Sequence, residues 1–348
     1  MDEKKKQVLG DVGRFIGKKL MEASPYIATD IAFKKVFYHR TQSEPISYFD
    51  NSLFPELKAE RVAFKSGKNV LTGYFYSYKN VDKSKIVIFA HGYGNGHHRY
   101  LDIINYLASQ GLYVFGYDAT SFDESNGDGI FGFPQGIIDL ESAINFVKKS
   151  KNYKENDISL IGHSWGAYSV GCVLNLFPNI SKAIMMSGFN TSSDLIRQHG
   201  IEWGGNKIDS TIEYLDEYEE FRFGEYHSLS VVDGIKNSKT EIFVIHSEDD
   251  KAVPIKIGLD LYKNTFKKLD RISFKRFKDR GHGCVYCTES GKDYYEELTN
   301  EYRKYLKNKK DASIEDKKHL FNLIVNNDRY INLLNYHLMD SIVDFIKM

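Results

Sequence analysis

Apolar positions recur at helical spacing near the start of the chain and give way to short strand-like runs from about residue 58. Residues 7–40 therefore predict an amphipathic helical extension. Its apolar side is formed by Val8, Val12, Phe15 and Ile16, and its other sides carry Arg14, Lys18 and Lys19. We expect this extension to pack on the body of the protein, and attachment to an anionic membrane surface is the alternative.

The middle of the chain alternates strand-like and helical segments. It begins with two β-branched and aromatic runs around the turn Ser66-Gly67-Lys68-Asn69, which predict a hairpin. The predicted strands are 59–64, 70–78, 86–90, 112–117, 158–161, 183–186, 242–245 and 272–277, and the predicted helices are 100–109, 136–148, 165–176, 255–266 and 331–346. Beyond the hairpin the runs are apolar without alternation, which indicates burial on both faces. We therefore predict an α/β fold with a mostly parallel central sheet and helices on both faces.

A serine stands where the strand at 158–161 meets the next helical segment, in the sequence Gly162-His163-Ser164-Trp165-Gly166. A G-x-S-x-G pentapeptide in this context is typical of a tight turn that projects the serine hydroxyl from the carboxyl end of a sheet. The glycines leave room for the backbone to fold closely, and the helix that follows directs its free N–H groups toward the same spot. The pentapeptide alone is common by chance, and a helix start rich in small residues is the alternative.

A serine nucleophile needs an adjacent base that is itself oriented by a third group. In an elbow of this kind the acid and the histidine follow later strands, in the order Ser, Asp, His. The strand at 242–245 is followed by three neighbouring carboxylates, Glu248, Asp249 and Asp250, and the strand at 272–277 is followed by Gly281-His282. The residues alone leave the choice among the three carboxylates open.

These motifs resemble the α/β-hydrolase superfamily, in particular its capped serine esterases and serine aminopeptidase-like members. The resemblance covers roughly residues 58–283 and includes a D-x-x-V-P motif at Asp250–Pro254, a G-H motif at Gly281-His282 and an H-G-x-G motif at His91–Gly94. It implies an α/β-hydrolase fold with an inserted cap. The loop that begins at Asp118 lacks the arginine and both glycines of the family pattern. Any substrate specificity that this loop confers in the family is therefore not carried over to this chain.

The same resemblance implies a role for each site residue. Ser164 would be the nucleophile, His282 the general base and Asp250 the orienting acid. The backbone N–H groups of Tyr93 and Trp165 would form the oxyanion hole.

The resemblance also implies a function. We expect a serine hydrolase that cleaves a carboxylic ester or amide through an acyl-enzyme intermediate, with no cofactor and no metal. A peptidase or an acyltransferase on the same triad is one alternative, and a catalytically silent binding protein on the same scaffold is another. A serine at the elbow excludes the branches of the superfamily that use an aspartate nucleophile.

The segment 191–238 is rich in aromatic and acidic side chains and follows the end of a predicted strand. Because pockets of open α/β sheets lie at the carboxyl ends of the strands, we interpret it as a cap, and a plain surface helix is the alternative. The predicted organisation is an N-terminal extension at 1–57, a core at 58–190 and 239–283, the cap at 191–238, a helical insertion at 284–330 and a final core helix at 331–348. The insertion is expected either to pack on the cap or to mediate a homodimer.

Amino-acid composition limits the classes of binding partner and the cellular location that we expect. The chain of 348 residues carries 47 basic and 47 acidic side chains, so charge gives no reason to expect nucleic acid or another polyanion. Three cysteines do not make a disulfide framework, and we expect a cytoplasmic location. No run of about twenty apolar residues occurs, so neither export nor a membrane span is expected. The expected partner is a small acyl ester or amide.

Several further residues are interpreted as structural. The C-x-x-C at Cys284–Cys287 has no second pair with which to build a zinc site. His97 and His98 lack a spaced set of carboxylates that would complete a metal site. His91 is expected to brace the oxyanion loop, and Asp118 to accept local N–H bonds in a turn.

Overall fold

The computed structural model describes residues 25–79, 81–204, 208–307, 309 and 311–348. Its strands are β1 (Lys58–Ser66), β2 (Asn69–Ser77), β3 (Ile86–Ala90), β4 (Val114–Tyr117), β5 (Ile158–His163), β6 (Lys182–Met186), β7 (Glu241–Ser247) and β8 (Ile272–Phe277). They form one sheet with the order β1-β2-β4-β3-β5-β6-β7-β8. The pairs β1–β2 and β2–β4 are antiparallel, and all pairs from β4 to β8 are parallel. The predicted mostly parallel sheet is confirmed.

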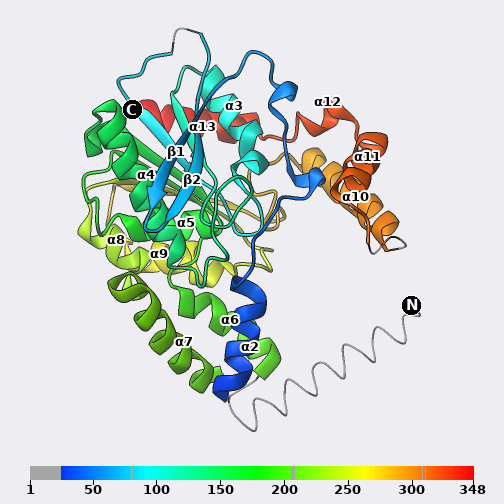
Figure 1. The fold of residues 1–348 in the computed structure, drawn as a ribbon. Helices are drawn as coiled ribbons and strands as arrows, with labels where there is room; N and C mark the ends of the chain where they lie inside the picture. The colour runs from blue at the N-terminus through cyan, green and yellow to red at the C-terminus, as the bar shows by residue number, and fades with distance from the viewer. Residues whose placement is uncertain (1–24, 80, 205–207, 308, 310) are drawn as a thin grey trace.

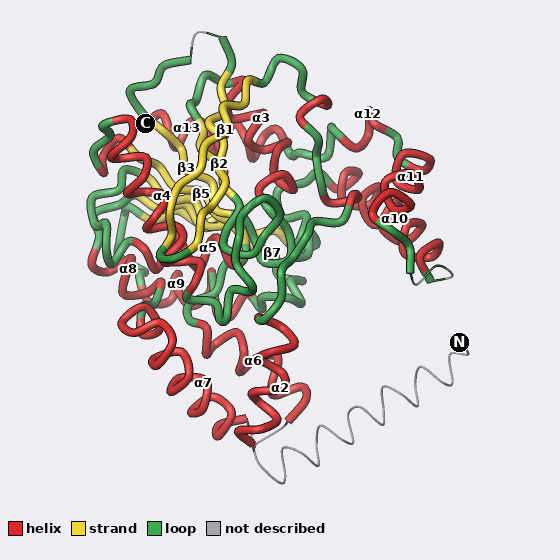
Figure 2. The backbone as a smooth tube through the Cα atoms, in the orientation of Figure 1, coloured by secondary structure: helices red, strands yellow, loops and turns green. Residues whose placement is uncertain are grey.

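Helices cover both faces of this sheet (Figure 1, Figure 2). One face is covered by α4 (Gln135–Lys151), α5 (Trp165–Val173), α8 (Val231–Asn237) and α9 (Leu259–Thr265), and the other by α3 (Leu101–Ser109) and α13 (Tyr336–Lys347). The helices α10 (Glu289–Leu306), α11 (Ile314–Ile324) and α12 (Asn327–Tyr330) extend the second core to one side of the sheet. Successive side chains of β3 alternate between the two cores, with Ile86 and Ile88 in one and Val87 and Phe89 in the other. Burial on both faces explains why the strands read as continuous apolar runs.

Two predicted helices are wrong at their boundaries. The helix predicted at 255–266 is interrupted at Gly258, where ψ is −111°, so a short 3-10 turn at Ile255–Ile257 precedes α9. The helix predicted at 331–346 begins only at Tyr336. Asn335 caps α13, because its side-chain oxygen accepts a hydrogen bond from the Leu338 N–H at 3.2 Å.

Three helices form a group beside the body of the molecule (Figure 1). They are α2 (Pro25–Phe37), α6 (Ser192–Gly204) and α7 (Ile208–Phe223). The last turns of α2 pack on α7, and the ring centroids of Phe33 and Tyr218 are 5.1 Å apart. The end of the N-terminal extension therefore lies against the segment that we interpret as a cap. Seven positions of the predicted amphipathic helix lie outside the described residues, namely Val8, Val12, Arg14, Phe15, Ile16, Lys18 and Lys19.

The insertion at 284–330 contains α10, α11 and α12, which form a lobe away from α6 and α7 (Figure 1). The buried face of α10 carries Tyr294, Leu298 and Tyr302. The Tyr302 hydroxyl donates to Glu44 Oε2 at 3.0 Å, and the Tyr295 hydroxyl lies 3.0 Å from Ser47 Oγ. The apolar stripe of α10 is thus used in packing within the chain.

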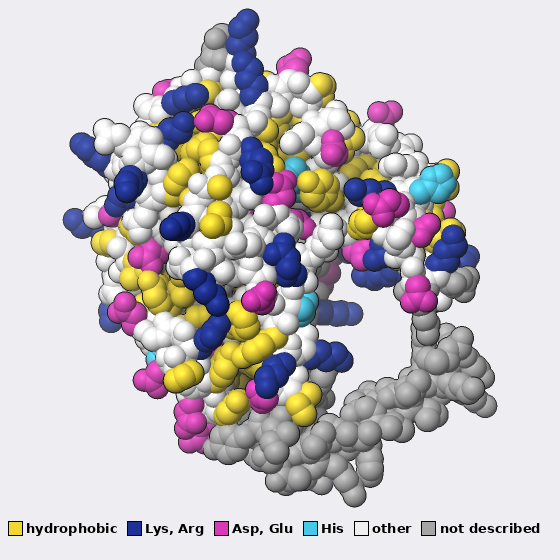
Figure 3. Space-filling model, in the orientation of Figure 1, with side chains coloured by type: hydrophobic (Ala, Val, Ile, Leu, Met, Phe, Trp, Pro, Cys, Tyr) yellow, Lys and Arg dark blue, Asp and Glu magenta, His cyan; other side chains and the backbone are white. Residues whose placement is uncertain are grey.

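Charged side chains of both signs are interspersed over the face drawn in Figure 3, with apolar side chains between them. Ile31 and Val36 of α2 and Phe221 of α7 are among the exposed large apolar residues. Within the part of the chain that the structure describes, no helix combines the length and the apolar character needed to cross a bilayer.

Glu219 of α7 is a buried carboxyl group with a consequence for stability. Its side chain is 1% exposed, and its Oε1 accepts a hydrogen bond from Ser192 Oγ at 2.7 Å. Burial raises the pKa of Glu219 from 4.5 to about 8. Between these two pH values the folded chain holds a proton at this site and the unfolded chain does not, so the stability contributed by Glu219 falls as pH rises.

We therefore expect stability to fall less between pH 5 and pH 8 in Glu219→Gln than in the original chain, by about 3 to 4 kcal/mol. Urea unfolding at the two pH values measures this difference. Glu220→Gln is the matched control, because it removes the same charge from an exposed neighbouring position. An equal change in both variants would contradict the assignment to the buried carboxyl.

Candidate active site

Ser164 lies in a tight turn between β5 and α5. Its backbone has φ 56° and ψ −118°, a conformation that residues other than glycine rarely adopt. A Cβ atom at Gly162 would come within 2.3 Å of the Gly166 carbonyl oxygen, and one at Gly166 within 2.1 Å of the Ala90 carbonyl oxygen. Both glycines of the G-x-S-x-G motif are thus required by close backbone contacts. The turn leaves Ser164 partly exposed at the carboxyl end of the sheet.

The structure brings Ser164, His282 and Asp250 together from three separate loops. His282 Nε2 lies 2.8 Å from Ser164 Oγ, and His282 Nδ1 lies 2.8 Å from Asp250 Oδ2. The His282 side chain is 23% exposed and that of Asp250 is fully buried. Because a carboxylate only accepts, Nδ1 carries the proton and Nε2 is free to accept the proton of Ser164.

Asp250 is held as a carboxylate by several donors. Its Oδ1 accepts hydrogen bonds from the N–H groups of Ala252 at 3.0 Å and Val253 at 2.8 Å. Burial opposes the charged form, but hydrogen bonds from His246 and His282 hold the pKa of Asp250 below its ordinary value. Asp250 therefore remains negative near pH 7 and can orient the imidazole of His282.

The two competing carboxylates point elsewhere. Asp249 Oδ1 accepts from Ser247 Oγ at 2.6 Å and from the Gly281 N–H at 2.8 Å. Glu248 pairs with Arg276 at 3.1 Å. Asp249 thus fixes the loop in front of His282, and Asp250 is the carboxylate that contacts the imidazole.

His246 is a site neighbour that sequence reasoning missed. Its Nε2 lies 2.9 Å from the Val253 carbonyl oxygen and 3.2 Å from Asp250 Oδ2. A histidine four residues before a candidate acid was visible in the sequence. The contact itself depends on the turn that brings Asp250 back over the end of β7, and the sequence did not reveal this turn.

His91 fixes the peptide unit that contains the Tyr93 N–H. Its Nδ1–H donates to the Gly92 carbonyl oxygen at 2.8 Å, and its Nε2 accepts the Ala119 N–H at 2.8 Å. Burial lowers the pKa of His91 to about 4, so the ring is neutral near pH 7. Since the Gly92 carbonyl and the Tyr93 N–H share one peptide plane, this contact sets the direction of that N–H.

Trp165 is the first residue of α5, so its N–H has no partner within the helix and lies at the positive end of the helix dipole. Its indole Nε1–H donates to the Phe133 carbonyl oxygen at 2.8 Å. The side chain is therefore anchored away from the turn, and only the backbone N–H of Trp165 is available beside Ser164.

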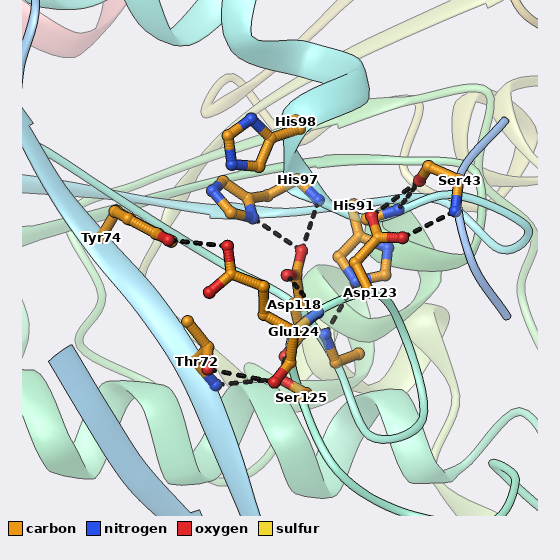
Figure 4. Close-up of polar contacts among 12 residues, drawn as sticks. Ser43, Thr72, Tyr74, His91, His97, His98, Asp118, Asp123, Glu124 and Ser125 are labelled. Carbon is orange, nitrogen blue, oxygen red and sulfur yellow. Dashed lines mark hydrogen bonds and ion pairs between the residues drawn. The ribbon is translucent and has the colours of Figure 1, made fainter. Parts of the chain in front are cut away.

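A buried polar cluster holds the loop between His91 and His97, which follows β3 (Figure 4). Asp118 accepts from the His97 N–H at 2.9 Å, from His97 Nδ1 at 2.6 Å and from the Glu124 N–H at 3.2 Å. Asp123 accepts from the backbone N–H and the hydroxyl of Ser43 at 2.6 and 2.7 Å. Asp118 therefore accepts a local bond, as predicted for a turn, but its stronger partner is the distant His97.

The cysteine pair and His98, which were considered for metal binding, are buried and take part in local packing and hydrogen bonding. Cys284 and Cys287 are buried free thiols, and the Cys287 N–H donates to the Cys284 carbonyl oxygen at 2.9 Å in a turn. His98 Nδ1 contacts the Phe49 carbonyl oxygen at 2.9 Å. Among the described residues, no group of three or more side chains is arranged to hold a metal ion.

Aromatic rings from distant segments gather around Phe133, whose carbonyl oxygen accepts the Trp165 indole N–H. Phe133 contacts Phe37 of α2 at 5.0 Å and Phe189 at 5.4 Å between ring centroids. The Tyr93 ring lies 6.1 Å from that of Phe133 and 6.2 Å from that of Trp165. A buried aromatic cluster thus joins α2 to the oxyanion loop and to the segment after β6.

A sequence model of the prolyl oligopeptidase family matches residues 135–309, half of the chain. An uncharacterized protein of Acanthamoeba polyphaga mimivirus is 30% identical to this chain over 197 residues. That match covers 53% of this chain and 63% of the viral protein, so the chain matches less than two-thirds of that relative's length.

Solved structures of hydrolases share the fold. The Pyrococcus furiosus esterase Pf2001 is 18% identical, with a TM-score of 0.54 over 78% of this chain and 98% of its own. An acylaminoacyl peptidase in complex with Z-Gly-Gly-Phe-chloromethyl ketone is 19% identical, with a TM-score of 0.50 over 74% of this chain and 43% of its own. The predicted α/β-hydrolase fold is confirmed by these similarities.

Proposed function

Because the chain belongs to the prolyl oligopeptidase family of α/β-hydrolases, and is accordingly a hydrolase, we propose that it cleaves carboxylic esters by a serine mechanism. The observation that carries the proposal is the pair of 2.8 Å contacts that link Ser164 Oγ, His282 and Asp250. A serine hydroxyl, an imidazole that accepts its proton and a carboxylate that orients the imidazole are the parts that acyl transfer requires.

In the proposed reaction, His282 Nε2 takes the proton from Ser164 Oγ as the oxygen attacks the ester carbonyl. The backbone N–H groups of Tyr93 and Trp165 donate to the oxyanion that forms. His282 then gives its proton to the leaving alcohol, and a water molecule, activated by the same imidazole, releases the acid from Ser164. Asp250 remains ionised throughout and stabilises the imidazolium of His282.

We assign α6 and α7, together with α2, to a cap over this site; α8, the last helix of the predicted cap 191–238, packs on α5 at the face of the sheet. The support for the cap is its position, since α6 follows the carboxyl end of β6 and α7 packs on α2. The support for an apolar or aromatic acyl group is the aromatic composition of the segment 191–238. Aromatic surfaces of this kind bind apolar groups by burying them from water.

Peptidase activity on the same triad is the second candidate. It is favoured by the family match, which is to a family of oligopeptidases. Amide cleavage uses the same nucleophile and oxyanion donors but requires that His282 protonate a more basic leaving nitrogen. The two activities therefore differ in leaving group rather than in the residues that act.

The test compares p-nitrophenyl esters of increasing acyl length with peptide p-nitroanilides. We expect hydrolysis of the esters with a preference for longer or aromatic acyl groups. Faster hydrolysis of an anilide than of the matched ester would favour the peptidase.

Labelling by a fluorophosphonate probe checks the nucleophile without a substrate. Folded protein should be labelled at Ser164, and heat-denatured protein should not, because only the folded site activates the hydroxyl. Absence of both labelling and hydrolysis in folded protein would favour a silent scaffold.

A further inference from the structure

Two buried side chains outside the proposed triad connect the loops that carry its parts. His163 precedes Ser164 at the end of β5, and Tyr100 precedes α3; each is 4% exposed. His163 Nε2 lies 2.9 Å from the His282 carbonyl oxygen, and His163 Nδ1 lies 2.9 Å from Tyr100 Oη. Tyr100 Oη in turn accepts the Gly92 N–H at 3.2 Å. One chain of hydrogen bonds therefore joins the loop of the base to the oxyanion loop.

Each bond in this chain has one allowed direction. The His282 carbonyl oxygen only accepts, so His163 Nε2 must carry a proton. Burial lowers the pKa of His163 to about 3, which keeps the ring neutral and leaves Nδ1 as an acceptor. Nδ1 then accepts a hydrogen bond from the Tyr100 hydroxyl, while the Tyr100 oxygen accepts one from the Gly92 N–H. Every donor in the chain has an acceptor.

A third glycine-dependent contact of the site, after those at Gly162 and Gly166, lies in this chain. A Cβ atom at position 92 would lie 2.7 Å from Tyr100 Oη and 3.3 Å from His163 Nδ1. Glycine is therefore needed at position 92 for the tyrosine hydroxyl to reach the backbone. The hydroxyl is in close contact with the turn that presents the Tyr93 N–H.

We propose that His163 and Tyr100 are positioning residues that hold the general-base loop and the oxyanion loop in one fixed relation. Tyr100 holds the Gly92 N–H, and His91 holds the Gly92 carbonyl oxygen. Both peptide planes of the turn before Tyr93 are thus fixed. The other end of the chain holds the His282 backbone, whose side chain is fixed separately by Asp250. The inference rests on the proposed function, because it assigns these residues to the same reaction.

The reaction requires this fixed geometry because two events occur together. His282 takes the serine proton while the oxyanion donors, the Tyr93 and Trp165 N–H groups, bind the charge that develops on the attacked carbonyl. Preorganised donors stabilise the transition state only when they point at the position of the developing charge. A displacement of about 1 Å at such a site can cost about a hundredfold in rate. Loss of one link in the chain should therefore weaken transition-state binding more than substrate binding.

Tyr100→Phe is the sharpest test, because it removes one oxygen and keeps the ring that packs near Phe89 and Tyr286. We expect kcat for a p-nitrophenyl ester to fall about tenfold, with KM within twofold of the original value. The inhibition constant of phenylboronic acid, whose tetrahedral adduct with the serine places an oxygen in the oxyanion site, should rise by a similar factor. A purely structural role would leave the boronate-to-substrate ratio unchanged.

Tyr330→Phe is the matched control. Tyr330 is fully buried, and its hydroxyl donates to the Ile46 carbonyl oxygen at 3.0 Å, outside the hydrogen-bond chain of His163 and Tyr100. Tyr330→Phe also removes a buried tyrosine hydroxyl, which makes one hydrogen bond where that of Tyr100 makes two. We expect kcat and boronate affinity of Tyr330→Phe to stay within twofold of the original. Equal kinetic losses in the two variants would overturn the inference.

His163→Gln tests the other half of the chain. A glutamine amide can still donate to the His282 carbonyl oxygen but offers no acceptor at the position of Nδ1. We expect a loss of kcat similar to that of Tyr100→Phe, and a double variant that is little worse than either single one, because both changes break one chain. Full multiplication of the two losses would contradict a single chain.

The outcomes separate this inference from the proposed function. If the original chain is labelled at Ser164 and hydrolyses esters while Tyr100→Phe behaves like it, the positioning role fails and the proposed function stands. If the original chain is neither labelled nor active, both fail. Nitrogen-15 spectra of histidine-labelled protein give a readout that needs no activity: His163, assigned by its loss in His163→Gln, should show a neutral ring protonated at Nε2 from pH 5 to pH 9. A signal protonated at Nδ1 would overturn the inference.

Discussion

Ser164→Ala is expected to lower kcat for p-nitrophenyl ester hydrolysis about a millionfold, as for other serine nucleophiles that act with a histidine. Without Oγ there is no atom for His282 to activate and no acyl-enzyme, so only weak catalysis by the oxyanion donors and substrate binding remains. The measurement is the steady-state rate of purified variant and original chain at equal concentration. Fluorophosphonate labelling of the variant should be lost in parallel.

Ser169→Ala is the control for this substitution. Ser169 lies on the same helix, and its hydroxyl donates to the Trp165 carbonyl oxygen at 2.9 Å within that helix. It removes the same atom from a neighbouring turn, and we expect kcat to remain within about threefold of the original. If Ser164→Ala kept more than about one part in a thousand of the rate while remaining folded, a nucleophile other than Ser164 would have to be sought.

The strands could be predicted because their signal is local. Runs such as Ile86–Ala90 and Ile158–His163 are apolar at every position, since both faces of the sheet are covered. The elbow could be predicted for a similar reason. The glycines at 162 and 166 are required by backbone contacts within one turn and its neighbouring strand. The local geometry therefore leaves a recognisable pattern in the sequence.

Contacts between distant segments could not be predicted in this way. The packing of α2 on α7 joins residues that are 185 positions apart, as at Phe33 and Tyr218, and neither helix carries a signal that names its partner. The same holds for Tyr302 and Glu44. Amphipathic spacing shows that a helix buries one face, but it does not show what covers that face.

The site was predictable only where a motif was present. Ser164, Asp250 and His282 each lie in a short pattern with its own spacing, and the structure brings these three together. Tyr100 and His246 lie in no such pattern, because a hydrogen bond through a single buried side chain leaves no periodicity in the sequence. The signal nearest to finding Tyr100 was the glycine of the H-G-x-G motif, whose hydrogen atom faces the tyrosine hydroxyl.

Asp250→Asn is expected to lower kcat about ten-thousandfold, as it does when the carboxylate of a serine triad is replaced by an amide. The orientation of the new side chain is decided by the backbone. The N–H groups of Ala252 and Val253 both point at Oδ1, so the amide oxygen must stay there and the NH₂ group must face His282. His282 Nδ1 then has to accept, its proton moves to Nε2, and Nε2 can no longer take the proton of Ser164.

Asp249→Asn makes the same change one residue earlier and tests the choice between the two carboxylates. Asp249 accepts from Ser247 Oγ and the Gly281 N–H through one oxygen, and an amide can keep that oxygen in place. We therefore expect kcat to fall less than about fivefold, since the loop in front of His282 is retained. Rates for both variants, measured from pH 5 to pH 9, decide the matter. A larger loss in Asp249→Asn would move the orienting acid to that residue, because only the carboxylate that fixes the tautomer of His282 should be indispensable to the rate.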